Sequence, residues 1–98
     1  MGAPGPVVTG AGGASLGYQQ ISAATLAAAT GLTIPTGASI AVVRVDTAPV
    51  RWRDDGTAPT AAIGMQMLST DPPFMFDNLA SLKFILASGS PVLNVSYY

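Results

Sequence analysis

Apolar and polar residues alternate along four short stretches of the chain, which is the period of a strand with one buried face. In Pro49–Arg53, the apolar side chains of Val50 and Trp52 share one face, and two arginines share the other. The same alternation recurs in three further stretches, which are Met65–Met67, Leu82–Leu86 and Leu93–Tyr97. We therefore expect four half-buried strands, with Trp52 in the core.

Three further strands are expected upstream of these four. Ser39–Val45 is apolar at nearly every position, which is typical of a central strand covered on both faces. It is expected to pair with Pro49–Arg53 as a hairpin through residues 46–48. Gly31–Gly37 contains Pro35, whose missing N–H suits a short edge strand. Tyr18–Ser22 is expected to form another strand.

Ser22–Thr30 is the one stretch in which a helix competes with extended structure. Ser22 is a residue type that caps helices, and Gly31 is a residue type that ends them. A helix over Ala23–Ala29 would present only one large apolar side chain, Leu26. Because such a helix would bury little, the pattern favours non-helical structure here.

Turn-forming Gly, Pro, Asn and Asp recur every six to twelve residues from Gly17 onward, a spacing typical of short antiparallel strands. The fold class expected is all-β, a small antiparallel β-sandwich of about six to eight strands over residues 17–98. Met1–Leu16 holds five Gly and two Pro, and its apolar anchors are Val7, Val8 and Leu16. We expect this extended N-terminal arm to lie along neighbouring subunits; the alternative is an arm folded back on its own domain.

Charge is scarce, with four Lys or Arg, five Asp and no Glu among 98 residues, for a net charge of −1. Binding to nucleic acid or to an anionic membrane requires clustered basic residues, so neither is expected as a partner. No apolar run approaches the ~18 residues of a membrane-spanning helix, and Met1–Leu16 lacks the features of a signal peptide. The absence of cysteine excludes disulfides and thiolate chemistry.

Catalysis is not expected, because the chain also lacks His and Glu, the commonest acid–base groups besides Asp. The adjacent pair Asp54 and Asp55 precedes Gly56 in a turn signal, where both carboxylates would be solvated. Asp54, Asp55 and Thr57 could offer oxygens to Ca²⁺, but the spacing falls short of a calcium loop. Gly10–Gly13 lacks the lysine of a phosphate-binding loop. We predict no metal and no cofactor.

We therefore expect the protein to act through contacts with other proteins and not through catalysis. Arg51 and Arg53 are expected on one strand face beside Asp54 and Asp55, either as an exposed hairpin tip with local ion pairs or as a latch between subunits. Tyr98 is expected to face outward at the C-terminus. The candidate interface residues are therefore Val7, Val8, Leu16, Arg51, Arg53, Asp54, Asp55 and Tyr98.

Two sequence motifs, VRWRDDGTAPTAAIGMQM (Val50–Met67) and LKFILASGSPVLNVSYY (Leu82–Tyr98), resemble a loose class of small tailed-bacteriophage virion proteins. Those proteins show a V-R-[WY] strand, a D-G-x-x-P-T turn, then G-M-x-L and a final N-V-x-Y strand. The likeness extends to GLTIPTGASIAVVRV (Gly31–Val45). It implies a β-sandwich structural protein that binds copies of itself and other virion proteins, and it implies no chemistry.

The first functional hypothesis is a capsid decoration or cement protein in the virion, bound mainly to the major capsid protein. A homo-oligomer, for example a trimer, is expected. A tail, baseplate or head-fibre subunit is the alternative within the virion. A different class of function, a module that binds host-surface carbohydrate, would use Trp52, Tyr98, Arg51 and Asp55 for stacking and polar contacts, but the alternation places Trp52 inward.

Overall fold

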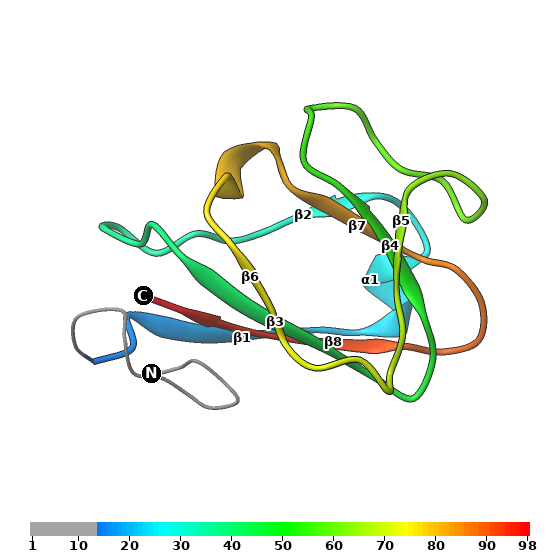
Figure 1. The fold of residues 1–98 in the computed structure, drawn as a ribbon, viewed down its shortest axis with the longest axis horizontal. Coiled ribbons are helices and arrows are strands. Elements are labelled where there is room, and N and C mark those ends of the chain that lie inside the picture. The colour runs from blue at the N-terminus through cyan, green and yellow to red at the C-terminus, as the bar shows by residue number, and fades with distance from the viewer. Residues whose placement is uncertain (1–13) are drawn as a thin grey trace.

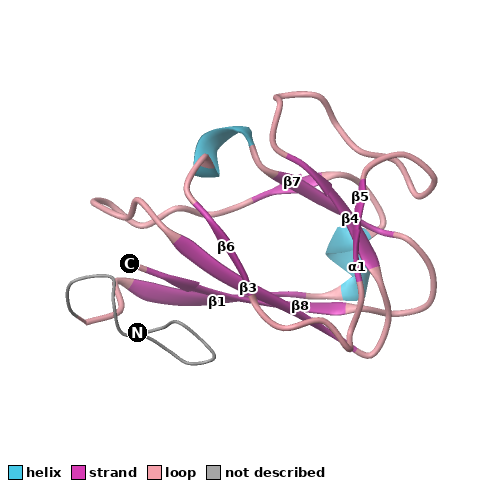
Figure 2. Cartoon of the chain, viewed as in Figure 1, coloured by secondary structure: helices cyan, strands magenta, loops and turns pink. Residues whose placement is uncertain are grey.

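A computed structural model of the chain describes residues 14–98, which form eight strands and two short helices (Figures 1 and 2). In chain order these elements are β1 (Gly17–Ile21), α1 (Ala23–Leu26), β2 (Thr30–Gly31), β3 (Ala41–Asp46), β4 (Val50–Arg53), β5 (Met65–Met67), β6 (Phe74–Phe76), the 3₁₀ helix η1 (Leu79–Ser81), β7 (Lys83–Leu86) and β8 (Val92–Tyr97). In this part of the chain no helix is long and apolar enough to cross a membrane.

The strands form two four-stranded antiparallel sheets that face each other, so the predicted all-β sandwich is confirmed (Figure 1). Sheet A has the order β1-β8-β3-β6, and sheet B has the order β2-β7-β4-β5. The first strand pairs with the last, the second with the seventh, the third with the sixth and the fourth with the fifth. This is one long hairpin rolled up, the topology of a jelly roll.

The core lies between the sheets and follows the predicted alternation. Val50, Phe84 and Val95 have no exposed surface, and Tyr97 is only 1% exposed. Trp52 is partly buried against this cluster, and its ring lies edge-on to Phe76 with centroids 4.9 Å apart. Its inward orientation is therefore confirmed.

The predicted hairpin between Ser39–Val45 and Pro49–Arg53 is wrong. β3 pairs with β6 and β8 in sheet A, whereas β4 pairs with β5 and β7 in sheet B. The connection is a corner between the sheets, where Thr47 adopts a left-handed φ of 74° and its hydroxyl donates to the Ser90 carbonyl at 2.7 Å. Both strands point apolar side chains at the same core, and a local alternation does not distinguish this corner from a hairpin.

β3 is a central strand, as predicted, but it is not covered on both faces. Ala41, Val43 and Val45 are buried, while Val42 is half-buried and the Arg44 side chain is 52% exposed. No layer covers the outer face of sheet A in the described part of the chain. The small apolar residue at position 42 therefore faces outward without making a second core.

Two other stretches differ from expectation. Of the edge strand expected over Gly31–Gly37, only Gly31 lies in a strand, the two-residue β2 (Thr30–Gly31), and the rest is a loop. Ser22–Thr30, where the pattern favoured no helix, contains the single turn α1. The Ser22 hydroxyl caps it by accepting from the Thr25 N–H at 3.4 Å. Leu26 is fully buried, so one large side chain is enough to anchor a one-turn helix.

Candidate functional site

Arg51 fastens the long connection between β4 and β5. Its Nε donates to the Ala61 carbonyl and its Nη1 to the Gly64 carbonyl, both at 2.9 Å. Within the described residues Arg51 forms no ion pair with Asp54 or Asp55, and pairing with acids of a neighbouring subunit stays a prediction. The guanidinium fork binds two backbone carbonyls of one loop, which positions that loop against the outer face of sheet B.

The loop held by Arg51 displays a group of large apolar side chains. Thr60 closes a tight turn with Ile63, because the Thr60 N–H donates to the Ile63 carbonyl at 2.8 Å and the Thr60 hydroxyl accepts from the Ile63 N–H at 2.9 Å. Ile63, Met65 and Leu68 are 59%, 60% and 42% exposed, respectively. We call these three residues the β5 ridge, since they follow the edge strand of sheet B.

Sequence reasoning missed the β5 ridge. The alternation in Met65–Met67 assigns both methionines to one buried face, yet Met67 is 1% exposed and Met65 is 60% exposed. Met65 lies opposite Trp52 at the point where β5 begins. Met65 is the first residue of β5, and only the tertiary structure shows that its side chain lies beyond the core.

Arg53 and Asp55 form an ion pair beyond the end of β4, with Arg53 Nε 3.1 Å from Asp55 Oδ1. The hydrogen bond from Arg53, followed by that from the Thr57 N–H, lowers the pKa of Asp55, and the bond to Asp55 raises the pKa of Arg53. Gly56 completes the turn with a φ of 84°. Asp54 is exposed, and its carbonyl accepts from the Asn78 side chain at 2.8 Å. An intersubunit latch built from these residues stays a prediction.

Replacing Arg51 with alanine is expected to lower the free energy of unfolding by about 1–2 kcal/mol, because two charge-assisted hydrogen bonds are lost. Amide hydrogen exchange over residues 60–64 should accelerate, since the loop loses its clasp. Urea unfolding and exchange mass spectrometry measure these effects. Arg53→Ala is the matched control, because its ion pair is solvent-exposed. An equal effect of both variants on amide exchange in the loop would contradict the role of Arg51 in holding the loop.

Strands β1 and β8 come from opposite ends of the described chain and pair side by side. All nine charged side chains lie in the interval from Arg44 to Lys83. β1 and the Thr33–Pro35 loop precede this interval and β8 follows it, so none of these three segments carries a charged side chain.

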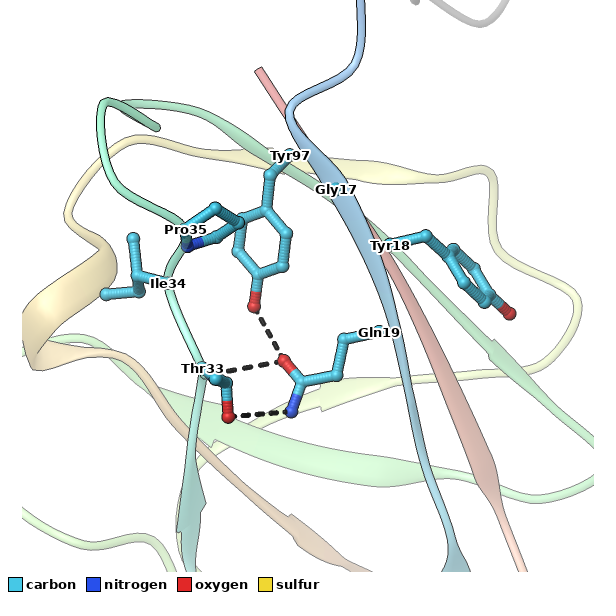
Figure 3. A pocket seen from close by; sticks show the side chains of 7 residues that line it. All are labelled: Gly17, Tyr18, Gln19, Thr33, Ile34, Pro35 and Tyr97. Atoms are coloured by element: carbon cyan, nitrogen blue, oxygen red, sulfur yellow. Dashed lines mark hydrogen bonds between the residues drawn. The ribbon is translucent and has the colours of Figure 1, made fainter.

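A pocket of about 370 Å³ opens among these uncharged segments, between β1 and the loop that follows β2 (Figure 3). Its lining residues are Gly17, Tyr18, Gln19, Thr33, Ile34, Pro35 and Tyr97. The Gln19 Oε1 accepts from the Tyr97 hydroxyl at 2.7 Å and from the Thr33 N–H at 3.1 Å. The Gln19 Nε2 donates to the Thr33 hydroxyl at 3.2 Å. We call this the β1 pocket; sequence reasoning missed it because its parts are distant along the chain.

Burial raises the pKa of the Tyr97 hydroxyl above its usual value of 10.0. Because the folded state favours the neutral phenol, this contribution to stability is complete below pH 10 and is lost as the pH rises through the higher folded pKa. The free energy of unfolding should therefore fall in alkaline solution. In Tyr97→Phe this fall should be shallower, while at pH 8 the lost bond to Gln19 should cost about 1 kcal/mol. Urea unfolding at pH 8 and pH 11 measures both, with Tyr98→Phe as the control; parallel pH profiles for the two variants would contradict the assignment.

The outer face of sheet A carries a ladder of polar side chains. Tyr18 and Gln20 both donate to the Asn94 Oδ1, in the second case at 3.1 Å. Asn94 in turn donates to Asp46 at 2.7 Å, and Arg44 donates to the other oxygen of Asp46 at 3.3 Å. These groups satisfy one another, so this face has the character of an ordinary solvated sheet surface.

The remaining predicted interface residues lie near the two ends of the chain. The Leu16 N–H donates to the Tyr97 carbonyl at 2.7 Å, and its side chain is 48% exposed. Tyr98 is half-buried, and its N–H and carbonyl pair with the backbone of Ile40. Its role as an outward contact residue stays a prediction. Val7 and Val8 lie outside the described residues.

Comparison with known proteins identifies no relative: no protein-family model, curated protein or solved structure matches the chain. Jelly rolls serve as viral capsid domains, lectins and cupins, so the topology alone assigns no function. Within residues 14–98 there is also no group of three or more metal-ligating side chains. The β5 ridge and the β1 pocket are therefore the two candidate functional sites.

Proposed function

We propose that the protein is a structural subunit of a virion, a capsid decoration protein that binds neighbouring capsid subunits through the β5 ridge. The ridge carries this proposal. It places three large apolar side chains in solvent at a sheet edge, in a chain with only nine charged residues. The three residues lie within six positions of one another in sequence, at and beside β5. Exposed apolar groups that lie close together mark sites of protein contact.

Preorganisation of the ridge supports a contact role. The Arg51 clasp and the Thr60 turn hold the loop in place before any partner arrives. Binding to a loop that is already ordered loses less conformational entropy than binding to one that must fold. Among the described residues β5 pairs on one side only, with β4, so its other side could take an added strand, which is a common mode of protein association.

The free energy available from burying the β5 ridge is small, so it suits a protein that binds at many sites at once. Fully burying a large aliphatic side chain contributes about 1.5–3 kcal/mol, so completing the burial of three half-exposed ones yields a gross ~3 kcal/mol. That alone is weak. A capsid presents many identical sites, and an oligomeric decoration protein would engage several at once, which multiplies the effective affinity.

The choice of a virion over other assemblies rests on the sequence resemblance, with which the jelly-roll architecture is compatible. A carbohydrate-binding module is less favoured, because the aromatic side chain best suited to stacking is unavailable. Trp52 packs edge-on between Phe74 and Phe76. Arg51, a second residue assigned to that function, is occupied with backbone carbonyls.

Co-sedimentation with pre-expanded empty capsids of the virus that encodes the chain tests the proposal, with tail-only particles as the comparison. Met65→Ser should weaken capsid binding at least tenfold. Met75→Ser is the matched control, since Met75 is also an exposed methionine (51%) on an edge strand but belongs to sheet A. Pelleting with tails alone would assign the protein to the tail or fibre, and pelleting with neither, or equal losses in both variants, would contradict the proposal.

A further inference from the structure

The β1 pocket has the composition of an interface core and not that of a solvated cleft. None of its lining residues is charged, and the tyrosine ring that faces it, that of Tyr97, is 1% exposed. Depletion of charge distinguishes the buried centres of protein interfaces. Its volume of about 370 Å³ also lies within the range of pockets that hold ligands.

The hydrogen bonds inside the pocket select the chemistry of the occupant. The Gln19 Oε1 already accepts two hydrogen bonds, from Tyr97 and from Thr33. The Gln19 Nε2 carries two hydrogens, and within the described residues one of them is used, in the bond to the Thr33 hydroxyl. The pocket therefore favours a ligand that offers a carbonyl acceptor to Gln19 Nε2.

A proline-containing extended peptide meets these requirements. Proline has a backbone carbonyl and no N–H, and its restricted φ lowers the entropy lost on binding. In the pocket, Figure 3 shows the Tyr97 ring beside Pro35, with its hydroxyl directed at Gln19, whereas Tyr18 points away on the other side of β1.

The chain contains such a peptide next to the pocket in sequence. Pro4–Val8 reads PGPVV, and residues 1–13 include no charged side chain. The segment is joined through residues 9–16 to Gly17, which lines the pocket. An uncharged, proline-containing peptide and an uncharged, donor-presenting pocket are therefore parts of one chain.

The bonds at the start of β1 favour binding between copies. The Ser15 hydroxyl and the Leu16 N–H both donate to the Tyr97 carbonyl, at 3.2 and 2.7 Å. These contacts hold the incoming chain on the β8 side of β1, whereas the Thr33–Pro35 wall of the pocket lies on the other side. Eight residues separate Val8 from Gly17 and can span up to roughly 30 Å, which is enough to reach an adjacent domain.

We propose that Pro4–Val8 of one copy binds in the β1 pocket of a second copy, so that the chain assembles into homo-oligomers by exchanging N-terminal segments. The contact involves no other virion component. If this contact fails, the capsid-binding proposal loses this route to multivalent binding, but its own test, co-sedimentation of the Met65→Ser and Met75→Ser variants, is unaffected. Loss of capsid binding would leave this proposal standing.

Cysteine cross-linking of the full chain tests the contact directly, because the natural chain has no cysteine. An isotopically labelled Val7→Cys chain is mixed with an unlabelled Ile34→Cys chain, and the mixture is oxidised. Mass spectrometry then measures the yield of the disulfide between the two different chains. Ile34 is at the pocket rim and 37% exposed. We expect a yield at least fivefold above that of the control mixture, in which Met75→Cys replaces Ile34→Cys.

Two outcomes would overturn the proposal. Equal mixed-disulfide yields in the test and control mixtures would show that Val7 does not find the pocket. A Val7→Cys/Ile34→Cys double variant that cross-links within one chain, together with no excess of mixed disulfide between chains, would show binding in cis and not between copies.

Sedimentation equilibrium of the full chain provides a second measurement that leaves the described domain unaltered. Pro6→Asp places a charge in the proposed peptide, and Ala11→Asp places the same charge outside it. Pro6→Asp should raise the dissociation constant for self-association at least tenfold, and Ala11→Asp should change it less than twofold. A wild-type chain that remains a monomer at millimolar concentration, or equal effects of the two variants, would overturn the proposal.

Discussion

Trp52→Ala is expected to lower the free energy of unfolding by ~3–5 kcal/mol, the range observed when large aromatic core residues are truncated. The indole fills the space between sheet B and β6, where it makes edge-on contacts with Phe76 at 4.9 Å and with Phe74 at 6.4 Å. Alanine leaves a cavity that three rigid strands cannot close. Urea unfolding followed by circular dichroism measures the loss, since the variant has no tryptophan fluorescence.

Trp52→Phe separates the contribution of the ring from that of its N–H group. The Trp52 Nε1 is buried without a hydrogen-bond partner in the described part of the chain, so removing it sacrifices no bond. We expect a cost below ~1.5 kcal/mol, because most of the aromatic packing is kept. A loss as large as that of Trp52→Ala would mean that the N–H has a partner in solution.

Gly64→Ala is expected to destabilise the chain by about 2–3 kcal/mol and to disturb the β5 ridge. Gly64 has a φ of 142°, which side-chain-bearing residues rarely adopt. An added Cβ would lie 3.2 Å from each of three atoms: the Arg51 Cβ, the Pro59 Cβ and the Trp52 carbonyl oxygen. The backbone oxygen cannot move without distorting β4, so the loop must shift and its bonds to Arg51 must weaken.

Gly56→Ala is the matched control for backbone conformation without crowding. Gly56 also has a positive φ, of 84°, but an added Cβ would meet nothing within 4 Å. Its cost should be about 1 kcal/mol, from the left-handed backbone alone. Thermal unfolding ranks the two variants, and amide exchange over residues 60–64 should increase only in Gly64→Ala. Equal melting temperatures would show that the crowding at Gly64 is relieved without cost.

The strands and their buried faces followed from local pattern. Leu93, Val95 and Tyr97 alternate with polar residues, and all three are buried in β8. Val50 and Trp52 point inward in β4 for the same reason, because a period of two residues presents one face to the core whichever strand lies next to it. The turn at Asp55–Gly56 was equally predictable, since only the backbone conformation of glycine is needed there.

The partner of each strand did not follow from local pattern. A three-residue connection between β3 and β4 suits a hairpin, yet the chain turns a corner there, because each strand gains more by pairing with distant strands on either side. Pairing between β1 and β8 joins residues nearly 80 positions apart. That long-range pairing creates the β1 pocket, in which Gln19, Thr33 and Tyr97 meet.

The exposure of side chains at the sheet edges likewise could not be predicted without the tertiary structure. Met65 and Met67 have the same parity and nearly the same neighbours in sequence, but only Met67 reaches the core. Arg51 was predicted to bind carboxylates because its charge is visible in the sequence, whereas its actual partners are backbone carbonyls of a loop. Alternation along a strand orients each side chain, because it is set by local backbone geometry. What lies beyond the side chain depends on strand pairing, loop paths and sheet edges, which arise from contacts between residues far apart in the chain.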